Sequence, residues 1–143
     1  MSNLYIPGDF VARLLVVDDE ARMRKLVKDF LIKKNYEVIE ACDGEEAIEL
    51  FVENKDISLI ILDVMMPRMD GYEFVKTLRD GDCNIPVLMV TAKETSADKI
   101  AGFKAGTDDY MVKPVNEEEM LLRIAALLRR SNIANEHKLT AGS

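Results

Sequence analysis

The sequence LIILDVMMPRMDG, residues 59–71, joins a hydrophobic run directly to an acidic residue. Leu59 to Leu62 are four consecutive aliphatic residues, Asp63 follows them, and the turn-forming pair Asp70-Gly71 closes the stretch. A continuous aliphatic run without polar alternation is typical of a strand that is buried on both faces of a parallel sheet. The stretch therefore predicts a central strand that ends on a carboxylate.

Four further hydrophobic runs alternate with helical patterns on both sides of this strand. Asp43 with Glu46, and Asn116 with Glu119, are spaced as in the capping boxes that open helices. This alternation predicts an α/β fold: a doubly wound, five-stranded parallel sheet flanked by five helices. We expect the strand order 2-1-3-4-5, with strands at about 14–17, 36–39, 59–62, 86–90 and 110–112 and helices at about 23–30, 43–52, 71–80, 95–104 and 116–130.

A chain of 143 residues is long enough for one domain with a full hydrophobic core. Residues 12–130 hold all the predicted strands and helices. Residues 1–11 are expected to form an irregular leader. Residues 131–143 are polar and lack periodicity, so we expect a linker or tail toward an effector domain that is absent from this chain.

Composition and charge narrow the possible classes of protein. The formal net charge of -7 argues against nucleic-acid binding by this chain alone, because phosphate contacts need a basic surface. No hydrophobic run is long enough to span a membrane and no secretory signal is visible, so we expect no membrane partner. Cys42 and Cys83 have no metal or redox spacing. They are expected to be reduced thiols, which predicts a cytoplasmic protein.

Polar side chains follow four of the five predicted strands, at the point where each strand ends. Asp18 and Asp19 follow the first strand and Asp63 follows the third. Thr91 follows the fourth strand and Lys113 the fifth. In open α/β sheets, ligands bind beyond the carboxyl ends of the strands, where the strand order reverses. The three carboxylates are therefore expected to converge, with a hydroxyl and an ammonium beside them.

Three converging carboxylates repel one another unless a cation lies between them. Their hard oxygen atoms, with no histidine or thiolate nearby, favour Mg²⁺ over zinc or iron. A magnesium ion and Lys113 would leave room for a phosphoryl group and would neutralise its oxygens. A central carboxylate could then act as the nucleophile and form an aspartyl phosphate.

Four motifs carry a resemblance to a known family: DDE at 18–20, DVMMPRMDG at 63–71, VTAK at 90–93 and DDYMVKP at 108–114. In this order they resemble the receiver domain of two-component response regulators, and the second and fourth motifs are most similar to the OmpR/PhoB subfamily. The resemblance covers about residues 12–130. It implies a flavodoxin-like fold, Mg²⁺ as cofactor and phosphate transfer from a sensor histidine kinase. In that subfamily a winged-helix domain, absent here, binds DNA and regulates transcription.

The resemblance implies a role for each acid of the expected site. Asp63 matches the phosphoacceptor. Asp19 and Asp63 match direct Mg²⁺ ligands, and the Met65 backbone carbonyl matches a further ligand. Asp18 matches a ligand that acts through a bound water. Such a domain catalyses its own phosphorylation and dephosphorylation and is not a conventional turnover enzyme.

The resemblance also implies roles for residues of the fourth and fifth strands. Lys113 matches the lysine that contacts the phosphoryl oxygens, and a cis peptide is implied between Lys113 and Pro114. Thr91 and Tyr110 match the switch pair, in which the hydroxyl moves to the phosphoryl group and the aromatic ring moves inward. The expected catalytic residues are thus Asp63, Lys113 and Thr91.

A homodimer is implied through the helix at 95–104, the fifth strand and the last helix. Lys99 is expected to pair with Glu119 across this dimer. Asp109 is expected to pair with Arg123 in the same way. Such a contact is isologous and has two-fold symmetry. The expected interface residues are Lys99, Ile100, Phe103, Asp109, Glu119, Leu122 and Arg123.

The sequence leaves three alternatives open. A stand-alone receiver would act through its own surface, without an effector. An aspartyl-phosphate phosphohydrolase of the haloacid dehalogenase type would use the same nucleophile and Mg²⁺, but that class needs an acid two residues after Asp63, where this chain has Met65. A pseudo-receiver that only binds partners is disfavoured by the intact acids, threonine and lysine.

Overall fold

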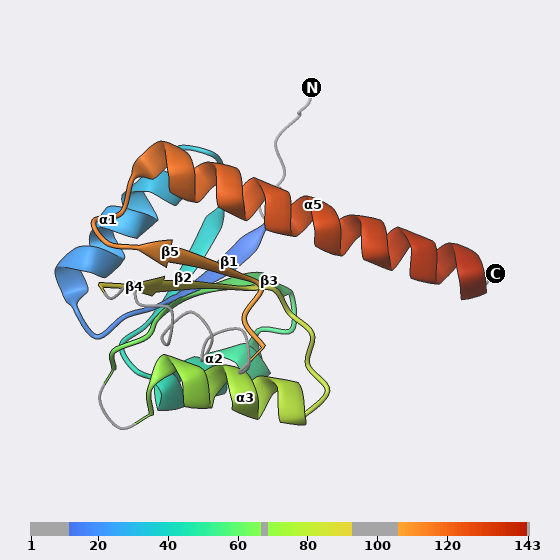
Figure 1. The fold of residues 1–143 in the computed structure, drawn as a ribbon, viewed down its shortest axis with the longest axis horizontal. Coiled ribbons are helices and arrows are strands. Elements are labelled where there is room, and N and C mark those ends of the chain that lie inside the picture. Colours follow the sequence, from blue (N-terminus) through green and yellow to red (C-terminus); the bar gives the residue numbers. More distant parts are fainter. Residues whose placement is uncertain (1–11, 67–68, 93–105, 143) are drawn as a thin grey trace.

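The computed structural model describes residues 12–66, 69–92 and 106–142. Five parallel strands form one sheet in the order β2-β1-β3-β4-β5, which confirms the predicted strand order (Figure 1). The centre of the sheet is β3, the strand that ends on Asp63. The strands are β1 (Arg13–Val17), β2 (Glu37–Ala41), β3 (Ile57–Asp63), β4 (Val87–Thr91) and β5 (Asp109–Val112).

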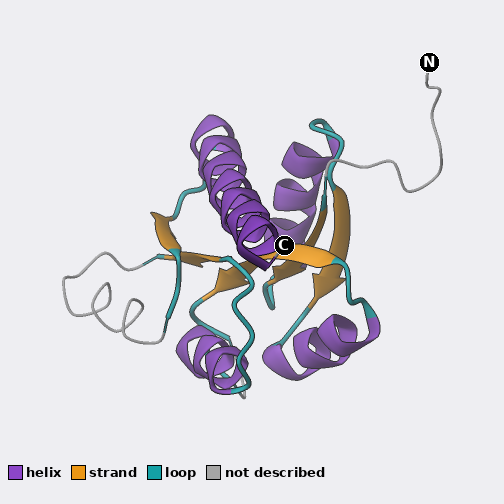
Figure 2. Ribbon diagram, turned by 90° about the vertical axis from the view of Figure 1, so that its right-hand side faces the viewer, coloured by secondary structure: helices purple, strands orange, loops and turns teal. Residues whose placement is uncertain are grey.

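Helices cover both faces of the sheet. Figure 1 and Figure 2 show α1 and α5 on one face and α2 and α3 on the other. The helix predicted at 95–104 lies outside the described residues. No helix within the described ranges is long and apolar enough to cross a membrane. The helices of the described residues are α1 (Ala21–Ile32), α2 (Gly44–Glu53), α3 (Gly71–Asp80) and α5 (Glu117–Gly142).

Alternate residues of each inner strand pack into two separate hydrophobic cores. Leu15 and Val17 of β1 belong to the core between the sheet and α2 and α3. Leu14 and Val16 belong to the core on the opposite face, with residues of α1 and α5. Burial on both faces explains why these runs are continuously aliphatic. The packed sheet that results holds the residues at its strand ends in fixed positions.

The predicted helix caps are present. Asp43 Oδ1 accepts a hydrogen bond from the Glu46 N–H at 2.8 Å. Asn116 Oδ1 accepts one from the Glu119 N–H, also at 2.8 Å. The return bond of the first capping box differs from the usual pattern, because Glu46 Oε1 accepts from the Cys42 N–H at 2.7 Å and so reaches one residue further back.

The predicted end of the last helix, near residue 130, is wrong. α5 continues to Gly142, and Figure 1 shows its C-terminal part extending past the edge of the sheet. Residues 131–141 contain no proline or glycine and include alanine, glutamate, lysine and leucine, all good helix formers. Their polar character lacks the periodicity of a packed face but is compatible with a solvated helix. That these residues lead to an effector domain stays a prediction.

Candidate functional site

Three carboxylates meet at the carboxyl edge of the sheet. Asp18 and Asp19 follow β1, and Asp63 ends the neighbouring strand β3. Each of the three offers an oxygen, and these oxygens lie within 4.8 Å of one another. Asp18 is 5% exposed and Asp63 is 6% exposed, whereas Asp19 lies at the surface. The convergence predicted from the strand ends is therefore present, and Asp19 is the solvent-exposed member of the cluster.

An ammonium group faces two of these acids. Lys113 Nζ lies 3.6 Å from Asp63 Oδ1 and 3.8 Å from Asp18 Oδ2. The Lys113 N–H donates to the Thr91 carbonyl at 2.7 Å, which ties the residue after β5 to the end of β4. The peptide bond between Lys113 and Pro114 is cis, as the resemblance implied. The two buried carboxylates, Asp18 and Asp63, thus share one lysine.

The position of Asp18 is determined by three hydrogen bonds. Its N–H donates to the Ala41 carbonyl at 3.1 Å, and its Oδ1 accepts from the Glu20 N–H at 2.8 Å. Its carbonyl oxygen accepts from Arg24 Nη1 at 2.7 Å. Arg24 is not among the predicted site residues, because its partner is a main-chain atom and no side-chain pattern in the sequence reveals such a contact.

The loop after Asp63 is packed closely against the start of α3. The Gly71 N–H donates to the Val64 carbonyl at 2.9 Å, and the Met65 N–H lies 3.3 Å from Asp63 Oδ1. A Cβ atom on Gly71 would lie 2.9 Å from the Asp63 carbonyl oxygen and 2.9 Å from Val64 Cα. Real Cβ contacts are essentially never that short. The sequence predicts only a turn at Gly71, whereas the structure shows that close approach of the backbone is what requires glycine here.

Burial raises the pKa of both inner acids. The pKa of Asp18 rises to about 6, mainly through burial, and the Asp63 charge contributes in the same direction. Burial also raises the pKa of Asp63, although the Lys113 charge and the Met65 N–H act against this effect. Both carboxylates are therefore held in an environment that disfavours their negative charge. A cation placed between them would relieve that cost.

The two expected switch residues occupy buried positions near the site. Thr91, at the end of β4, is 1% exposed. The Tyr110 ring lies in the core on the α2 and α3 face, and its hydroxyl is 3.1 Å from the Tyr72 hydroxyl. Met65 is largely exposed, whereas Met66 is buried.

The expected dimer residues that the structure describes lie on β5 and α5. Arg123 Nη1 contacts both carboxylate oxygens of Asp109, at 2.9 and 3.1 Å, within one chain. Arg123 also contacts Glu119 at 3.0 Å. The Asp109–Arg123 pair, expected across a dimer, is thus already formed inside the single chain. Leu122 is 66% exposed. The remaining three positions, Lys99, Ile100 and Phe103, lie outside the described residues.

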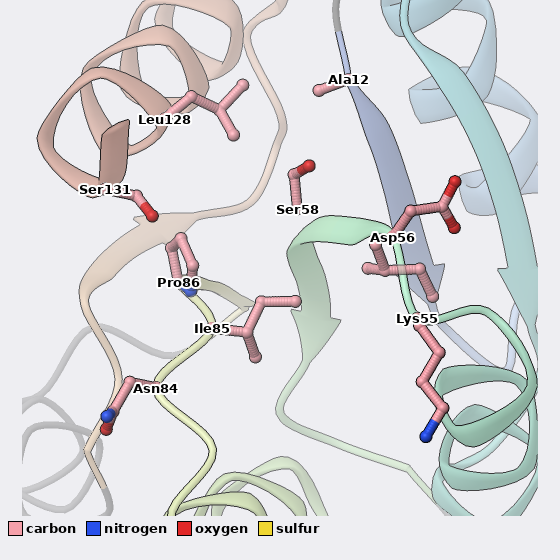
Figure 3. A pocket seen from close by; sticks show the side chains of 10 residues that line it. Ala12, Lys55, Asp56, Ser58, Asn84, Ile85, Pro86, Leu128 and Ser131 are labelled. Atoms are coloured by element: carbon pink, nitrogen blue, oxygen red, sulfur yellow. The ribbon is translucent and has the colours of Figure 1, made fainter. Parts of the chain in front are cut away.

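A cavity of about 470 Å³ lies away from the acids, near the residues that lead into β3 and β4 (Figure 3). Figure 3 shows Asp56 and Ser58 on one side and Leu128 and Ser131 of α5 on another. Parallel strands begin at the edge opposite the one where they end. The cavity therefore contains none of the convergent acids and does not contribute to the candidate site.

Comparison with known proteins shows which family the sequence of this chain resembles. Residues 14–125 match the sequence profile of the response regulator receiver domain. The chain is 47% identical over 120 residues to transcriptional regulatory protein ResD of Bacillus subtilis, covering 84% of this chain and 49% of that protein. It is 44% identical over 118 residues to transcriptional regulatory protein SrrA of Staphylococcus aureus, covering 82% and 48%. The chain thus spans about half the length of these relatives.

Solved structures show the same fold. The chemotaxis protein CheY4 of Vibrio cholerae superposes with a TM-score of 0.76 and 36% identity, covering 81% of this chain and 98% of that one. A putative response regulator from Chloroflexus aurantiacus superposes with a TM-score of 0.78 and 36% identity, covering 82% and 98%. These similarities confirm the flavodoxin-like α/β fold with its five-stranded parallel sheet.

Proposed function

The chain belongs to the response regulator receiver family of two-component signalling, and from that membership we propose that it accepts a phosphoryl group on Asp63. One observation carries the proposal. Asp63 ends the central strand, 3.6 Å from the Lys113 ammonium, within a cluster of three carboxylates whose oxygens lie within 4.8 Å of one another. The Asp63 carboxylate is buried at the end of β3, whereas the neighbouring Asp19 is exposed to solvent.

The proposed donor is a phosphohistidine of a sensor histidine kinase. An oxygen of the ionised Asp63 carboxylate attacks phosphorus, a new P–O bond forms, and the P–N bond to the histidine breaks with its electron pair leaving on nitrogen. Lys113 is close enough to balance negative charge on the phosphoryl oxygens. Asp63 must be ionised to attack, so the burial that raises its pKa has to be offset by nearby positive charge.

The donor set fits Mg²⁺ as the cofactor. The clustered ligands are carboxylate oxygens, with no histidine or cysteine among them, and hard cations prefer such oxygens. Asp19 and Asp63 would hold the ion directly, with the Met65 carbonyl as a further ligand and Asp18 acting through water. When bound, the ion supplies positive charge that neutralises the carboxylates and the phosphoryl oxygens.

Thr91 and Tyr110 are proposed to convert phosphorylation into a change of shape. A phosphoryl group adds about -1.5 to -2 charge units and new acceptor oxygens. Thr91 ends β4, beside the strand that carries Asp63, and its hydroxyl is a suitable donor to those oxygens. Its movement would change the space available to Tyr110 on the next strand, and so shift the population of two conformations.

The proposed output is control of an effector, through a homodimer of the OmpR/PhoB type. The relatives ResD and SrrA are transcriptional regulatory proteins about twice the length of the matched region. A winged-helix domain that binds DNA is therefore the proposed effector, following α5, in a cytoplasmic protein. The described part of the dimer surface consists of β5 and α5, where exposed Leu122 lies beside charged Glu119 and Arg123.

Acetyl phosphate, a small phosphoryl donor, tests the proposal without the kinase. The native chain is incubated with acetyl phosphate and Mg²⁺, and its intact mass is measured. One added phosphoryl group is expected in the native chain and none in Asp63→Asn. A native chain that gains no phosphoryl group under these conditions would contradict the proposal.

A further inference from the structure

The Arg24 guanidinium links the cluster of three acids to β2, the edge strand of the sheet. Its Nη1 donates to the Asp18 carbonyl at 2.7 Å, and its Nε donates to Glu40 Oε1 of β2 at 3.4 Å. The Arg24 side chain is only 18% exposed. The other oxygen of Glu40 contacts Lys28 Nζ, also at 3.4 Å. Arg24 and Lys28 thus share one acidic partner, but only Arg24 also contacts Asp18.

The Arg24 contact is important because its acceptor is a main-chain oxygen, that of Asp18. The Asp18 carbonyl belongs to the peptide group that joins Asp18 to Asp19, and a peptide group is planar. A hydrogen bond to that oxygen therefore restrains the orientation of the peptide group between two neighbouring acids of the cluster. The remaining bonds of Asp18, to Ala41 and Glu20, hold its N–H and one carboxylate oxygen. Its Oδ2 is left facing Lys113 at 3.8 Å.

We propose that Arg24 is a positioning residue for the Mg²⁺ site. It sets the relative placement of the Asp18 and Asp19 carboxylates through the peptide group between them. The inference rests on the proposed function, which supplies the magnesium ion. Its rival is that Arg24 only stabilises the packing of α1 against the sheet. The two roles can be distinguished by experiment. A contact that only stabilises packing would change the stability of the fold and leave the ion affinity of the folded chain unchanged.

Manganese provides a direct readout, because it binds the same hard oxygen ligands as magnesium. The purified chain is titrated with Mn²⁺, the unbound ion is followed by electron paramagnetic resonance, and Mg²⁺ is then added as competitor. Arg24→Ala is compared with Arg24→Lys, which keeps one charged donor, and with Lys28→Ala, which removes the other partner of Glu40. All variants are measured at a temperature at which circular dichroism shows them folded.

Arg24→Ala is expected to weaken binding of both ions by roughly tenfold, the lower end of the effect of removing an outer partner of a metal ligand. Arg24→Lys should recover part of that loss, and Lys28→Ala should bind as the native chain does. Equal affinity in Arg24→Ala and the native chain would overturn this inference and leave the proposed function standing. An equal loss in Lys28→Ala would also overturn it. A native chain that binds neither ion would overturn the proposed function together with this inference.

Discussion

The Lys113 ammonium lies 3.6 Å from Asp63 Oδ1, although β4 lies between β3, which ends on Asp63, and β5, which Lys113 follows. The lysine thus reaches across one strand to the central carboxylate. It also lies 3.8 Å from Asp18 Oδ2, so a single cation faces two buried acids. The positive charge of Lys113 is therefore the main nearby charge that stabilises the ionised Asp63 carboxylate. Removing this charge should affect phosphorylation more than the stability of the fold.

Lys113→Ala is expected to slow phosphorylation by acetyl phosphate by about 100-fold, the usual cost of losing a group that stabilises developing negative charge. The rate of adduct formation, followed by intact mass at saturating Mg²⁺, measures the effect. Lys55→Ala is the matched control, because Lys55 lines the cavity away from the acids. Equal rates for native chain and Lys113→Ala would show that the ammonium has no part in the transfer.

The pH dependence of stability tests the burial of Asp18. Its pKa is raised from 3.8 to about 6 in the folded chain, so the folded state binds more protons than the unfolded state between these values. Below pH 3.8 Asp18 is protonated in both states, and its stabilising contribution is fully present. That contribution to the free energy of unfolding is lost as the pH rises through about 6. Asp18→Asn has no carboxyl group at this position and so does not lose this contribution. The free energy of unfolding of Asp18→Asn, relative to that of the native chain, should therefore increase with pH.

Urea unfolding of both chains across this pH range, in the presence of a chelator, measures the difference. Comparing the two chains removes the contribution of carboxyl groups far from Asp18, which is common to both. Saturating Mg²⁺ should reduce the effect, because a bound cation favours the ionised acids. The same pH dependence in native chain and Asp18→Asn would contradict the account.

Gly71→Ala is expected to destabilise the fold by roughly 1–3 kcal/mol, because its Cβ would meet the Asp63 carbonyl oxygen and Val64 Cα at 2.9 Å. The displacement would also move the backbone of the phosphoacceptor, so phosphorylation should slow. Gly81→Ala is the control, since a Cβ there meets nothing closer than 3.6 Å. Urea unfolding gives the free energies. Equal stability of the two variants would mean that the loop tolerates a side chain at residue 71.

Phosphorylation is expected to shift the chain toward a dimer, and Leu122→Glu should prevent that shift. Leu122 is 66% exposed, so a charge at this position should leave the fold intact while opposing an apolar contact. Sedimentation velocity with and without acetyl phosphate and Mg²⁺ measures the change. Val52→Glu is the control, because Val52 is 59% exposed on α2, across the sheet. Dimerisation that persists in Leu122→Glu would place the interface elsewhere.

Much of the fold and of the site could be predicted because the signals are local. Aliphatic runs gave the strands, and the polar residue after each run gave Asp18, Asp63 and Lys113. The requirement for Gly71 and the contact of Arg24 could not be predicted, because in both cases the partner is a main-chain atom, of Asp63 and Val64 or of Asp18. Such partners leave no periodicity in the sequence.

The structure also differs from the sequence predictions at the end of α5 and at the Asp109–Arg123 ion pair. The polar residues after Arg130 suggested the end of a helix, but helix formation needs only compatible backbone and side chains, and packing is not required over every turn. The spacing of Asp109 and Arg123 cannot show whether an ion pair forms within one chain or between two. In the single chain the pair is intramolecular, so a dimer that uses it would have to exchange partners.

Chemical mapping of the phosphorylated residue tests directly whether Asp63 is the phosphoacceptor. The chain is treated with acetyl phosphate and Mg²⁺, the acyl phosphate is reduced with borohydride, and the peptides are sequenced by mass spectrometry. We expect reduction at Asp63 alone, with Asp18 and Asp19 unmodified, although an oxygen of each lies within 4.8 Å of an Asp63 oxygen. Reduction at Asp18 or Asp19, with Asp63 intact, would contradict the account.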